Sequence, residues 1–572
     1  MEKYEIEFIK WLESDKISDD VAEELKSFDE AEKKRRFSSY MTFGTAGLRA
    51  EMGVGSAFMN VYTVAHATAA LAKLITDLGE DAMRRGVVIA YDSRHNSPEF
   101  SRRAAEVLSA FGIKTYIFES LRPTPVLSFA IRELGCIAGI NVTASHNPKQ
   151  YNGYKAYFED GAQLSPDDAD TVQRYMTSLD IFDDVPTPDE ANEKLIVTVG
   201  HDLDEAYLAR VLEQRVNPGA IPAVADDLVI VYTPLHGAGA VMVPEVLRRS
   251  GVKKLFPVES QMAPDGSFPT VKFPNPEFPE AFNEGIPVAE REHSDLIVAT
   301  DPDSDRVGVM ARAKDGTFKC ITGNQMGALL LDYIITAYEN TKTMPPLPYA
   351  VKSIVSSEMA TKICASHGVK MYNVLTGFKF IGEVIKLHEE SGEGSFIFGF
   401  EESYGYLKGT YARDKDAVVT SMLICEMAAY YKERGMTLID ALEKLFERYG
   451  YFVESVTNVI MDTPDGKERM AKTMQRLREN SPSVIGDKKI VKVSDYLTGK
   501  VSELVTGKTG ETGLPSSNVL SFVTDDGGTI IIRPSGTEPK IKIYVLTEGK
   551  TLADARANAD RCLAEFKKLL EA

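Results

Sequence analysis

The sequence predicts a multidomain α/β protein, with three related domains of mixed, mainly parallel sheets and a smaller C-terminal α+β domain. Its 572 residues are too many for one hydrophobic core, since domains commonly contain roughly 100–200 residues. A pattern of strand, loop, helix, glycine and strand occurs three times along the chain, and the last part departs from it. We expect domains at residues 1–205, 206–315, 316–450 and 451–572.

The segment up to about Ser38 is charged and predicts amphipathic helices ahead of the first α/β domain. Its apolar side is supplied by Tyr4, Ile6, Phe8, Ile9 and Leu12. This pattern indicates helices that pack onto the first domain.

The three repeats begin with apolar strands at residues 87–90, 228–231 and 350–355. In each repeat a helix follows, and a glycine then ends it before the next strand, at Gly112, Gly251 and Gly368. Strands that alternate with helices favour mainly parallel sheets.

Each repeat continues to a second apolar strand that leads into a loop rich in polar side chains. These loops cover residues 143–148, 301–306 and 401–405. Ligands of parallel α/β sheets gather at the carboxyl ends of the strands. We therefore place the candidate site at these three loops.

The C-terminal part predicts a different architecture. Residues 468–479 and 552–570 have helical patterns, and residues 521–546 predict strands around the turn at 525–528. Linkers containing glycine and aspartate near Gly200 and near residues 463–466 mark the expected domain boundaries.

Asp301, Asp303 and Asp305 alternate along one loop and can surround a single cation. Carboxylate oxygens without cysteine or histidine suit Mg²⁺ or Ca²⁺, and Mg²⁺ is the usual partner of phosphates. An EF-hand would need glycine and glutamate where this loop has Arg306 and Arg312. A solvated acidic turn is the alternative, disfavoured because an apolar strand leads directly into the loop.

Ser145 is the candidate nucleophile. Asn147-Pro148 is a turn signal, so an ordinary turn serine is the competing interpretation. His146, Lys149 and Lys155 bring positive charge or proton acceptors near the hydroxyl, as phosphoryl transfer requires. We hypothesise that Ser145 is phosphorylated.

Two further loops have the chemistry of a phosphosugar site. Residues 533–537 combine an arginine, two hydroxyls and a glycine, the composition of a phosphate cradle, and this is compatible with a β-turn between strands. Glu401 and Ser403 could bind sugar hydroxyls or simply cap a strand. The Gly44–Arg49 turn is a weak signal by itself.

The bulk composition excludes several classes of function. The 65 basic and 84 acidic residues give a formal charge of −19, which argues against nucleic-acid and anionic-membrane binding. Five scattered cysteines indicate neither structural zinc nor a disulfide framework. The charged N-terminus and the lack of a membrane-length apolar stretch predict a cytoplasmic protein.

Taken in order, these loops resemble those of the α-D-phosphohexomutase family, which includes phosphoglucomutase and phosphomannomutase. The resemblance covers nearly the whole chain after about Ser38. Within the family, the sequence is most similar to the larger phosphoglucomutase branch. It rests on the motifs at residues 43–49, 143–148, 301–306, 377–380, 401–403 and 533–537. It implies four domains around a central cleft, the first three being related α/β units.

The resemblance also implies roles for individual residues. Ser145 would carry the phosphate and, with Asp301, Asp303 and Asp305, hold one Mg²⁺. The other implied catalytic residues are Arg49, His146 and Lys155, with Lys155 a candidate for proton transfer. The implied substrate-binding residues are Arg306, Thr376, Gly377, Lys379, Glu401, Ser403, Arg413, Arg533, Ser535, Gly536 and Thr537.

The implied activity is the reversible interconversion of glucose 1-phosphate and glucose 6-phosphate through a phosphoserine and a glucose 1,6-bisphosphate intermediate, which also serves as activator. The Glu401-x-Ser403 loop favours glucose over mannose. The alternatives are phosphomannomutase or phosphopentomutase activity, synthesis or hydrolysis of a sugar bisphosphate, and a silent sugar-phosphate sensor. A phosphosugar is the only predicted partner, with no nucleic acid, membrane or obligate protein partner.

Overall fold

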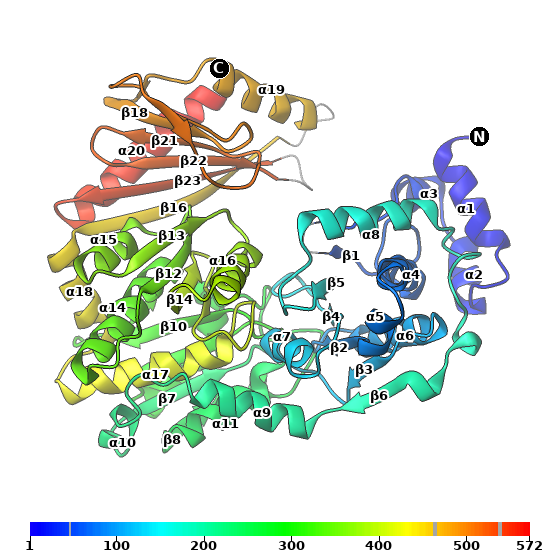
Figure 1. Ribbon diagram of the computed structural model, residues 1–572, viewed down its shortest axis with the longest axis horizontal. Coiled ribbons are helices and arrows are strands. Elements are labelled where there is room, and N and C mark those ends of the chain that lie inside the picture. Colours follow the sequence, from blue (N-terminus) through cyan, green and yellow to red (C-terminus); the bar gives the residue numbers. More distant parts are fainter. Residues whose placement is uncertain (45–46, 462–465, 536–539, 572) are drawn as a thin grey trace. The chain divides into compact units, whose positions relative to one another are not determined.

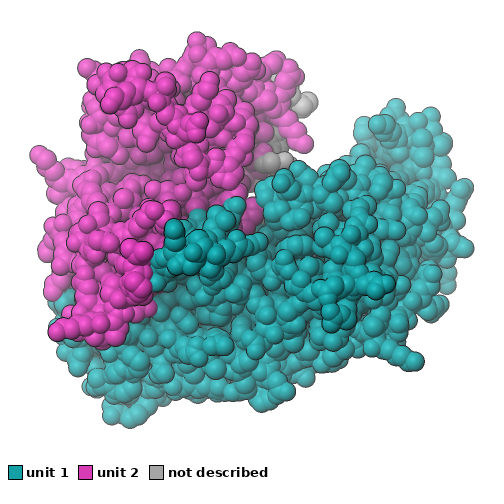
Figure 2. All heavy atoms as spheres, viewed as in Figure 1, with its two compact units in different colours: residues 1–322, 382–396, 404–437 teal, residues 323–381, 397–403, 438–572 magenta. Residues whose placement is uncertain are grey.

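A computed structural model describes residues 1–44, 47–461, 466–535 and 540–571. The chain forms two compact units, shown in teal and magenta in Figure 2. Unit 1 comprises residues 1–322, 382–396 and 404–437, and unit 2 comprises residues 323–381, 397–403 and 438–572. Across the described residues, every helix is too short or too polar to span a membrane.

Unit 1 begins with three short helices, α1 (Lys3–Glu13), α2 (Asp19–Lys26) and α3 (Glu30–Phe37). The Ser18 and Asp29 side chains accept hydrogen bonds from the first turns of α2 and α3 and so fix where these helices begin. Trp11 is fully buried in an apolar cluster with Phe37 and Phe182. The prediction that these helices pack onto the first α/β domain is confirmed.

The first sheet of unit 1 has the strand order β1-β5-β4-β2-β3-β6. Its strands are β1 (Leu48–Glu51), β2 (Val87–Tyr91), β3 (Thr115–Phe118), β4 (Ala138–Val142), β5 (Tyr151–Phe158) and β6 (Ile196–Val199). Its helices are α4 (Val61–Asp77), α5 (Glu80–Arg85), α6 (Ser97–Ala110), α7 (Thr124–Glu133) and α8 (Pro166–Ser178) (Figure 1). Strand β2 is parallel to β3 and β4, and its apolar side chains are buried, as is typical of parallel strands.

The second sheet of unit 1 has the order β11-β10-β9-β7-β8, with β7 parallel to both β8 and β9. Its strands are β7 (Val229–Thr233), β8 (Lys254–Pro257), β9 (Leu296–Thr300), β10 (Val307–Arg312) and β11 (Phe318–Ile321). The associated helices are α9 (His201–Leu212), α10 (Ala220–Ala223), α11 (Gly239–Arg249), α12 (Glu259–Met262) and α13 (Gly285–Arg291). Unit 1 also contains β15 (Gly405–Leu407) and α17 (Ala417–Glu433), which packs against α10 and α11.

Both sheets contain an antiparallel strand directly after a polar loop. Strand β5 returns beside β4 and follows the Ser145 loop, and β10 returns beside β9 and follows the aspartate loop. The sequence predicted mainly parallel layers and did not identify these return strands. They matter for function because β5 places Lys155 opposite Asn141 of β4, close to the strand end that leads to Ser145.

Unit 2 contains a sheet with β12 (Pro348–Ser353) between β13 (Lys370–Val374) and β14 (Ser395–Glu401). Strands β12 and β13 are parallel, α15 (Glu358–Ser366) packs against β13, and α14 (Gly323–Thr341) and α18 (Leu438–Tyr449) pack against α15. Helix α16 (Phe378–Ser391) follows β13. This confirms the strand, helix, glycine and strand pattern of the third repeat, since Gly368 lies between α15 and β13.

The C-terminal sheet of unit 2 has the order β16-β23-β22-β21-β18-β19-β20, and β17 pairs with β18. Its strands are β16 (Tyr451–Ile460), β17 (Val484–Ile485), β18 (Lys488–Asp495), β19 (Lys500–Glu503), β20 (Thr509–Glu511), β21 (Leu520–Thr524), β22 (Thr529–Pro534) and β23 (Lys540–Gly549). Its helices are α19 (Gly466–Glu479) and α20 (Leu552–Glu571), and α20 packs against β16 and β23. The strand pairs β16–β23, β22–β23, β21–β22 and β18–β21 are all antiparallel. The predicted α+β character is confirmed.

Candidate active site

Ser145 lies in the loop between β4 and β5 and is buried, with 2% of its surface exposed. Its hydroxyl donates a hydrogen bond to Asp301 Oδ2 at 2.8 Å and lies 3.2 Å from His146 Nδ1. The structure thus brings the predicted nucleophile and the first residue of the acidic loop together across 156 positions of sequence.

The backbone at Ser145 has an unusual conformation, with φ at +50°. The Thr143 hydroxyl accepts the Ser145 backbone N–H at 2.8 Å and donates to Asp92 Oδ2 at 2.6 Å. Left-handed conformations of residues other than glycine are uncommon and persist where surrounding contacts enforce them. The Ser145 side chain is therefore held in one fixed position.

The acidic loop lies between β9 and the returning strand β10. Oxygen atoms of Asp301, Asp303 and Asp305 lie within 4.8 Å of one another, and all three side chains are buried. The backbone amides of Asp305 and Arg306 donate to Asp301 Oδ1 at 3.2 and 3.0 Å, which folds the loop around this carboxylate. Three carboxylates so close together repel one another unless cations neutralise them.

The loop has the donor set of a divalent metal site. Among the residues that the structure describes, none donates a hydrogen bond to Asp303 Oδ1 or Asp305 Oδ1, although both atoms are buried. Arg306 Nε lies 3.8 Å from Asp305 Oδ1, beyond hydrogen-bonding distance, and a hard cation would satisfy both buried oxygens. The residues present therefore fit Mg²⁺.

Two lysines face the other side of the acidic loop. Lys155 Nζ lies 2.7 Å from Asp303 Oδ2 and 3.3 Å from Asp305 Oδ2. Lys415 Nζ lies 3.2 Å from Asp305 Oδ2 and 2.9 Å from Asp414 Oδ1. The sequence had identified Lys155 but not Lys415, which stands in an ordinary charged stretch and reaches the site only through the fold.

These charges shift the pKa values of the site in opposite directions. Burial raises the pKa of Asp301 well above its usual value, and the neighbouring carboxylates of Asp303 and Asp305 raise it further. Burial acts the same way on Asp305, but Lys415, Lys155 and Arg306 outweigh it and lower the pKa of Asp305. Asp301, which accepts the hydrogen bond from the Ser145 hydroxyl, thus favours a proton, whereas Asp305 is held ionised.

His146 and Lys155 are affected in turn. Burial lowers the pKa of His146 well below its usual value, and the cationic side chains of Arg306 and Arg49 lower it further, so the imidazole is neutral. Burial also disfavours the charged form of Lys155, but Asp303 and Asp305 outweigh it and raise the pKa of this lysine. As the structure stands, Lys155 is an ammonium.

Three predicted residues of unit 1 remain, namely Arg49, Arg306 and Arg413. Arg49 is exposed, and its guanidinium donates to Asn147 Oδ1 at 3.1 Å, beside the Ser145 loop. Arg306 forms an ion pair with Glu277. Arg413 is buried and binds the Thr410 carbonyl and Glu389. These contacts of Arg413 are internal, and its predicted role toward substrate stays a prediction.

Unit 2 holds the predicted sugar-binding residues. Thr376 and Gly377 form the connection between β13 and α16, and Lys379 lies in the first turn of α16. The Gly377 amide donates to Glu401 Oε1 at 2.6 Å, and Glu401 ends β14. The structure therefore brings the Gly377 loop and the buried Glu401 side chain together, with Ser403 two residues beyond.

The last predicted anchor lies on the C-terminal sheet of unit 2. Arg533 is in β22, and the Ser535 amide donates to the Lys540 carbonyl at 2.8 Å, where the chain returns as β23. Gly536 and Thr537 lie outside the described residues. The two strands that flank this motif, β22 and β23, are paired antiparallel.

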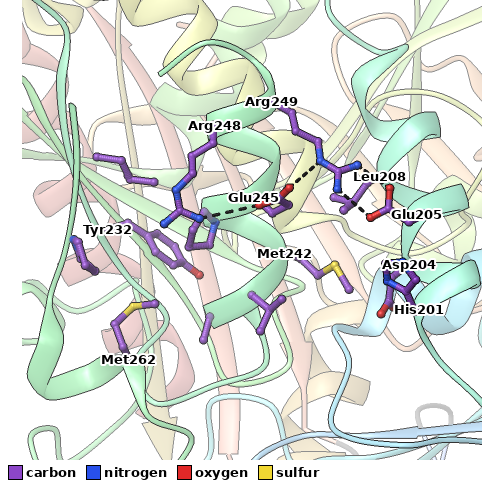
Figure 3. Close-up of a pocket in the computed structure, with 15 residues that line it drawn as sticks. His201, Asp204, Glu205, Leu208, Tyr232, Met242, Glu245, Arg248, Arg249 and Met262 are labelled. Atoms are coloured by element: carbon purple, nitrogen blue, oxygen red, sulfur yellow. Dashed lines mark hydrogen bonds and ion pairs between the residues drawn. The ribbon is translucent and has the colours of Figure 1, made fainter. Parts of the chain in front are cut away.

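A separate cavity of about 440 Å³ lies between α9, α11 and β8 in unit 1 (Figure 3). Apolar side chains such as Tyr232, Met242 and Met262 line it, and Arg249 at its rim is paired with Glu205 and Glu245. None of its lining residues is among those predicted for the site.

Four domain families, described as phosphoglucomutase/phosphomannomutase alpha/beta/alpha domains I, II and III and C-terminal domain, match residues 40–181, 205–315, 322–449 and 461–564. A phosphoglucomutase of Staphylococcus epidermidis is 37% identical over 516 residues, covering 90% of this chain and 92% of that protein. The chain belongs to the phosphoglucomutase/phosphomannomutase family.

A second relative and two solved structures are also similar to this chain. A phosphoglucomutase of Staphylococcus aureus strain MSSA476 is 37% identical over 525 residues, covering 91% of this chain and 92% of that protein. The open form of Paramecium parafusin, a phosphoglucomutase, has a TM-score of 0.68 at 18% identity, covering 93% of this chain and 96% of that chain. A family protein of Burkholderia thailandensis has a TM-score of 0.64 at 19% identity, covering 92% and 96%. The predicted family and the α/β fold class with its C-terminal domain are confirmed.

Proposed function

We propose that the chain is a phosphoglucomutase that interconverts glucose 1-phosphate and glucose 6-phosphate through phosphorylated Ser145. Relatives named phosphoglucomutase cover nine-tenths of the chain and support the reaction. The observation that carries the proposal is the 2.8 Å contact between the Ser145 hydroxyl and Asp301 Oδ2, which joins the nucleophile to the acidic loop.

The proposed cycle has two phosphoryl transfers. In the first, the bond between phosphorus and Ser145 Oγ breaks, a bond to the free sugar hydroxyl forms, and the hydroxyl proton passes through a base of the protein to the departing Ser145 oxygen. The product is glucose 1,6-bisphosphate. After this intermediate turns around, Ser145 Oγ attacks the other phosphate, and its proton passes back through the base to the sugar oxygen that leaves. Added glucose 1,6-bisphosphate would act as activator by phosphorylating free Ser145.

Asp301, Asp303, Asp305 and an oxygen of phosphorylated Ser145 would hold one Mg²⁺. When bound, this ion supplies charge neutralisation at the phosphoryl group that is being transferred. The protein contributes the fixed positions of its carboxylates, two of which carry buried oxygens that accept no hydrogen bond from a described residue.

The cationic residues of unit 1 would neutralise and direct the same group. Arg49 lies beside the Ser145 loop through its bond to Asn147 and would contact the phosphoryl oxygens. Lys155 is the candidate for proton transfer, since Mg²⁺ at the acidic loop would compete with its ammonium for the carboxylates of Asp303 and Asp305. His146, held neutral, can hydrogen-bond the serine oxygen without adding charge.

The substrate would be held at its sugar and at its second phosphate. Glu401 and Ser403, with Thr376, Gly377 and Lys379, would bind sugar hydroxyls. The phosphate that is not transferred would be bound by Arg533, Ser535, Gly536 and Thr537, and Arg306 and Arg413 would be further substrate-binding residues. Because the intermediate presents each end in turn, these contacts must accept the ligand in both orientations.

We also propose the domain division at residues 1–205, 206–315, 316–450 and 451–572. The sheets support its first and last boundaries, since β6 (Ile196–Val199) closes the first sheet and β16 (Tyr451–Ile460) pairs along its length with β23 in the last, whereas β11 (Phe318–Ile321) of the second sheet lies just past residue 315.

The reaction is tested with purified protein, glucose 1-phosphate, Mg²⁺ and a trace of glucose 1,6-bisphosphate. The proposal predicts glucose 6-phosphate as the product and a lower kcat/KM for mannose 1-phosphate and ribose 1-phosphate. A faster reaction with one of those substrates would replace glucose as the preferred sugar. Accumulation of bisphosphate or of inorganic phosphate instead of glucose 6-phosphate would contradict the mutase reaction.

A further inference from the structure

Arg94, which the mechanism above does not use, is completely buried behind the Ser145 loop. It follows β2 on the connection to α6, two residues after Asp92. The Arg94 and Asp92 side chains are both inaccessible to solvent, and Arg94 Nε lies 3.3 Å from Asp92 Oδ2. A buried ion pair is weak evidence for stability, because desolvation offsets much of the attraction, so another reason for this pair is needed.

The guanidinium of Arg94 binds the backbone of the whole nucleophile loop. Its Nη2 donates to the carbonyl oxygens of Ser145, at 2.5 Å, and Asn147. Its Nη1 donates at 2.9 Å to the carbonyl oxygens of Pro148 and Tyr151, where β5 begins. One rigid planar group therefore fixes the loop from the nucleophile to the next strand, which the single ammonium of a lysine cannot do.

These contacts explain how Ser145 is kept in its left-handed conformation. Arg94 holds the Ser145 carbonyl, and the Thr143 hydroxyl holds the Ser145 amide. Both depend on Asp92, which pairs with Arg94 and accepts the Thr143 hydroxyl at 2.6 Å. Asp92, Thr143 and Arg94 thus fix both sides of the nucleophile without touching the reacting atoms.

Arg94 also contacts the segment between α12 and α13, which leads on to β9 of the second sheet. The guanidinium carbon lies 5.0 Å from the centre of the Phe268 ring, a cation–π contact with a buried aromatic residue. Gly266 lies against the backbone here, since a Cβ at that position would come within 2.4 Å of the His95 nitrogen. Arg94 is therefore bound both to the Ser145 loop and to the domain that carries the acidic loop.

We propose that Arg94 is a positioning residue that holds Ser145 in register with the acidic loop during phosphoryl transfer. This inference rests on the proposed function of Ser145. Arg94 does not contact Ser145 Oγ or the acidic carboxylates in the described hydrogen bonds, so its effect is on the placement of the hydroxyl and not on the binding of sugar. Loss of this placement lowers the rate of the chemical step with little change in KM.

Arg85 offers a matched control in the same domain. Its guanidinium donates to the carbonyl oxygens of Gly135, at 2.9 Å, and Cys136, at 3.3 Å, just before β4 begins. It also pairs with Glu159 at 2.8 Å. Arg85 therefore binds carbonyls at the start of the strand whose other end carries the nucleophile, and far along that strand from Ser145.

The test compares Arg94→Lys and Arg85→Lys in the full chain with glucose 1-phosphate, Mg²⁺ and glucose 1,6-bisphosphate. We expect Arg94→Lys to lower kcat about 100-fold, as misplacement by about 1 Å does, with KM within about twofold. Arg85→Lys keeps kcat within about twofold. If the two variants have equal kcat, or if Arg94→Lys raises KM with kcat unchanged, the positioning role is wrong.

A second variant covers the case in which Arg94→Lys does not fold. Phe268→Leu keeps an apolar side chain below Arg94 and removes the ring, and we expect kcat to fall about fivefold to tenfold at unchanged KM. An unchanged kcat in Phe268→Leu, together with an unfolded Arg94→Lys, would make Arg94 a purely structural residue. Failure of the proposed function itself is distinct, because the wild-type protein and Arg85→Lys would then form no glucose 6-phosphate.

Discussion

The loops at residues 143–146 and 233–236 share a backbone turn but serve different purposes. In both, a threonine hydroxyl accepts the backbone N–H two residues later, at 2.8 Å for Ser145 and 3.0 Å for Leu235. Both of those residues are left-handed, with φ at +50° and +47°. The first loop follows β4, the second apolar strand of its repeat, and the second loop follows β7, the first strand of its repeat. The same turn therefore occurs at the ends of parallel strands that are not equivalent in the repeat.

The residue at the left-handed position decides what each loop does. Ser145 directs its hydroxyl to Asp301, whereas Leu235 is completely buried in an apolar cluster with Val231 and Ile297. The threonines are held by different groups as well, since Thr143 donates to a carboxylate and Thr233 donates to the Gln261 amide oxygen. The same backbone turn therefore presents the candidate nucleophile after a strand of the first sheet and a core side chain after a strand of the second.

The second loop still contributes to the site through its neighbours. The Ala238 amide donates to the Pro302 carbonyl at 2.7 Å, and a Cβ on Gly237 would lie 2.4 Å from Pro302 Cα. Pro302 stands inside the acidic loop. The comparison thus separates a loop that supplies the nucleophile from a loop that supports the metal-binding residues.

Alanine at the left-handed position should abolish turnover in the first loop and lower the stability of the protein in the second. Ser145→Ala is expected to lower turnover by more than about 10,000-fold while changing the free energy of unfolding by less than about 1 kcal/mol. Leu235→Ala is expected to lower the free energy of unfolding by about 2–5 kcal/mol and to keep turnover within about tenfold at saturating Mg²⁺. Steady-state kinetics and urea denaturation measure both quantities.

A Ser145→Ala variant that retains full turnover would eliminate the covalent mechanism. A Leu235→Ala variant that is as stable as the wild type would show that the second loop is not a packing element. Either result breaks the division of roles between the two loops.

Removing the threonine hydroxyls should change kcat less than Ser145→Ala does, and should change it in only one of the two loops. Thr143→Val and Thr233→Val each leave a buried amide without its acceptor, and each should cost about 1–3 kcal/mol of unfolding free energy. Only Thr143→Val is expected to lower kcat, by about tenfold to 100-fold, because it alone releases the nucleophile. Equal kcat values at saturating substrate and Mg²⁺ would show that the turn does not set the position of Ser145.

Much of the fold followed from the sequence because periodicity and turn signals are local. The apolar runs at residues 87–90, 228–231 and 350–355 are β2, β7 and β12, and Gly112, Gly251 and Gly368 precede the next strand in each case. The return strand β5 was missed because its polar and aromatic residues have no simple alternation. Its pairing beside β4 depends on tertiary packing, which local patterns do not describe.

The candidate site was predictable where its residues form contiguous motifs. Asp301, Asp303 and Asp305 lie on one loop, and the structure places their oxygens together. Arg94 and Lys415 were missed because their partners are distant in sequence, since Arg94 binds carbonyls more than 50 positions away and Lys415 reaches Asp305 across a much longer separation. Buried basic residues that bind backbone carbonyls or carboxylates have no sequence pattern of their own.

The most direct test of Ser145 as a phosphate carrier is a single-turnover experiment. Protein phosphorylated with glucose 1,6-bisphosphate is freed of ligand, mixed with glucose 1-phosphate and Mg²⁺, quenched at short times and analysed by mass spectrometry for phosphate on Ser145. The account predicts that phosphate leaves Ser145 and appears in glucose 1,6-bisphosphate at a rate at least equal to kcat. Phosphate that stays on Ser145 while glucose 6-phosphate forms, or that is found on another residue, would contradict it.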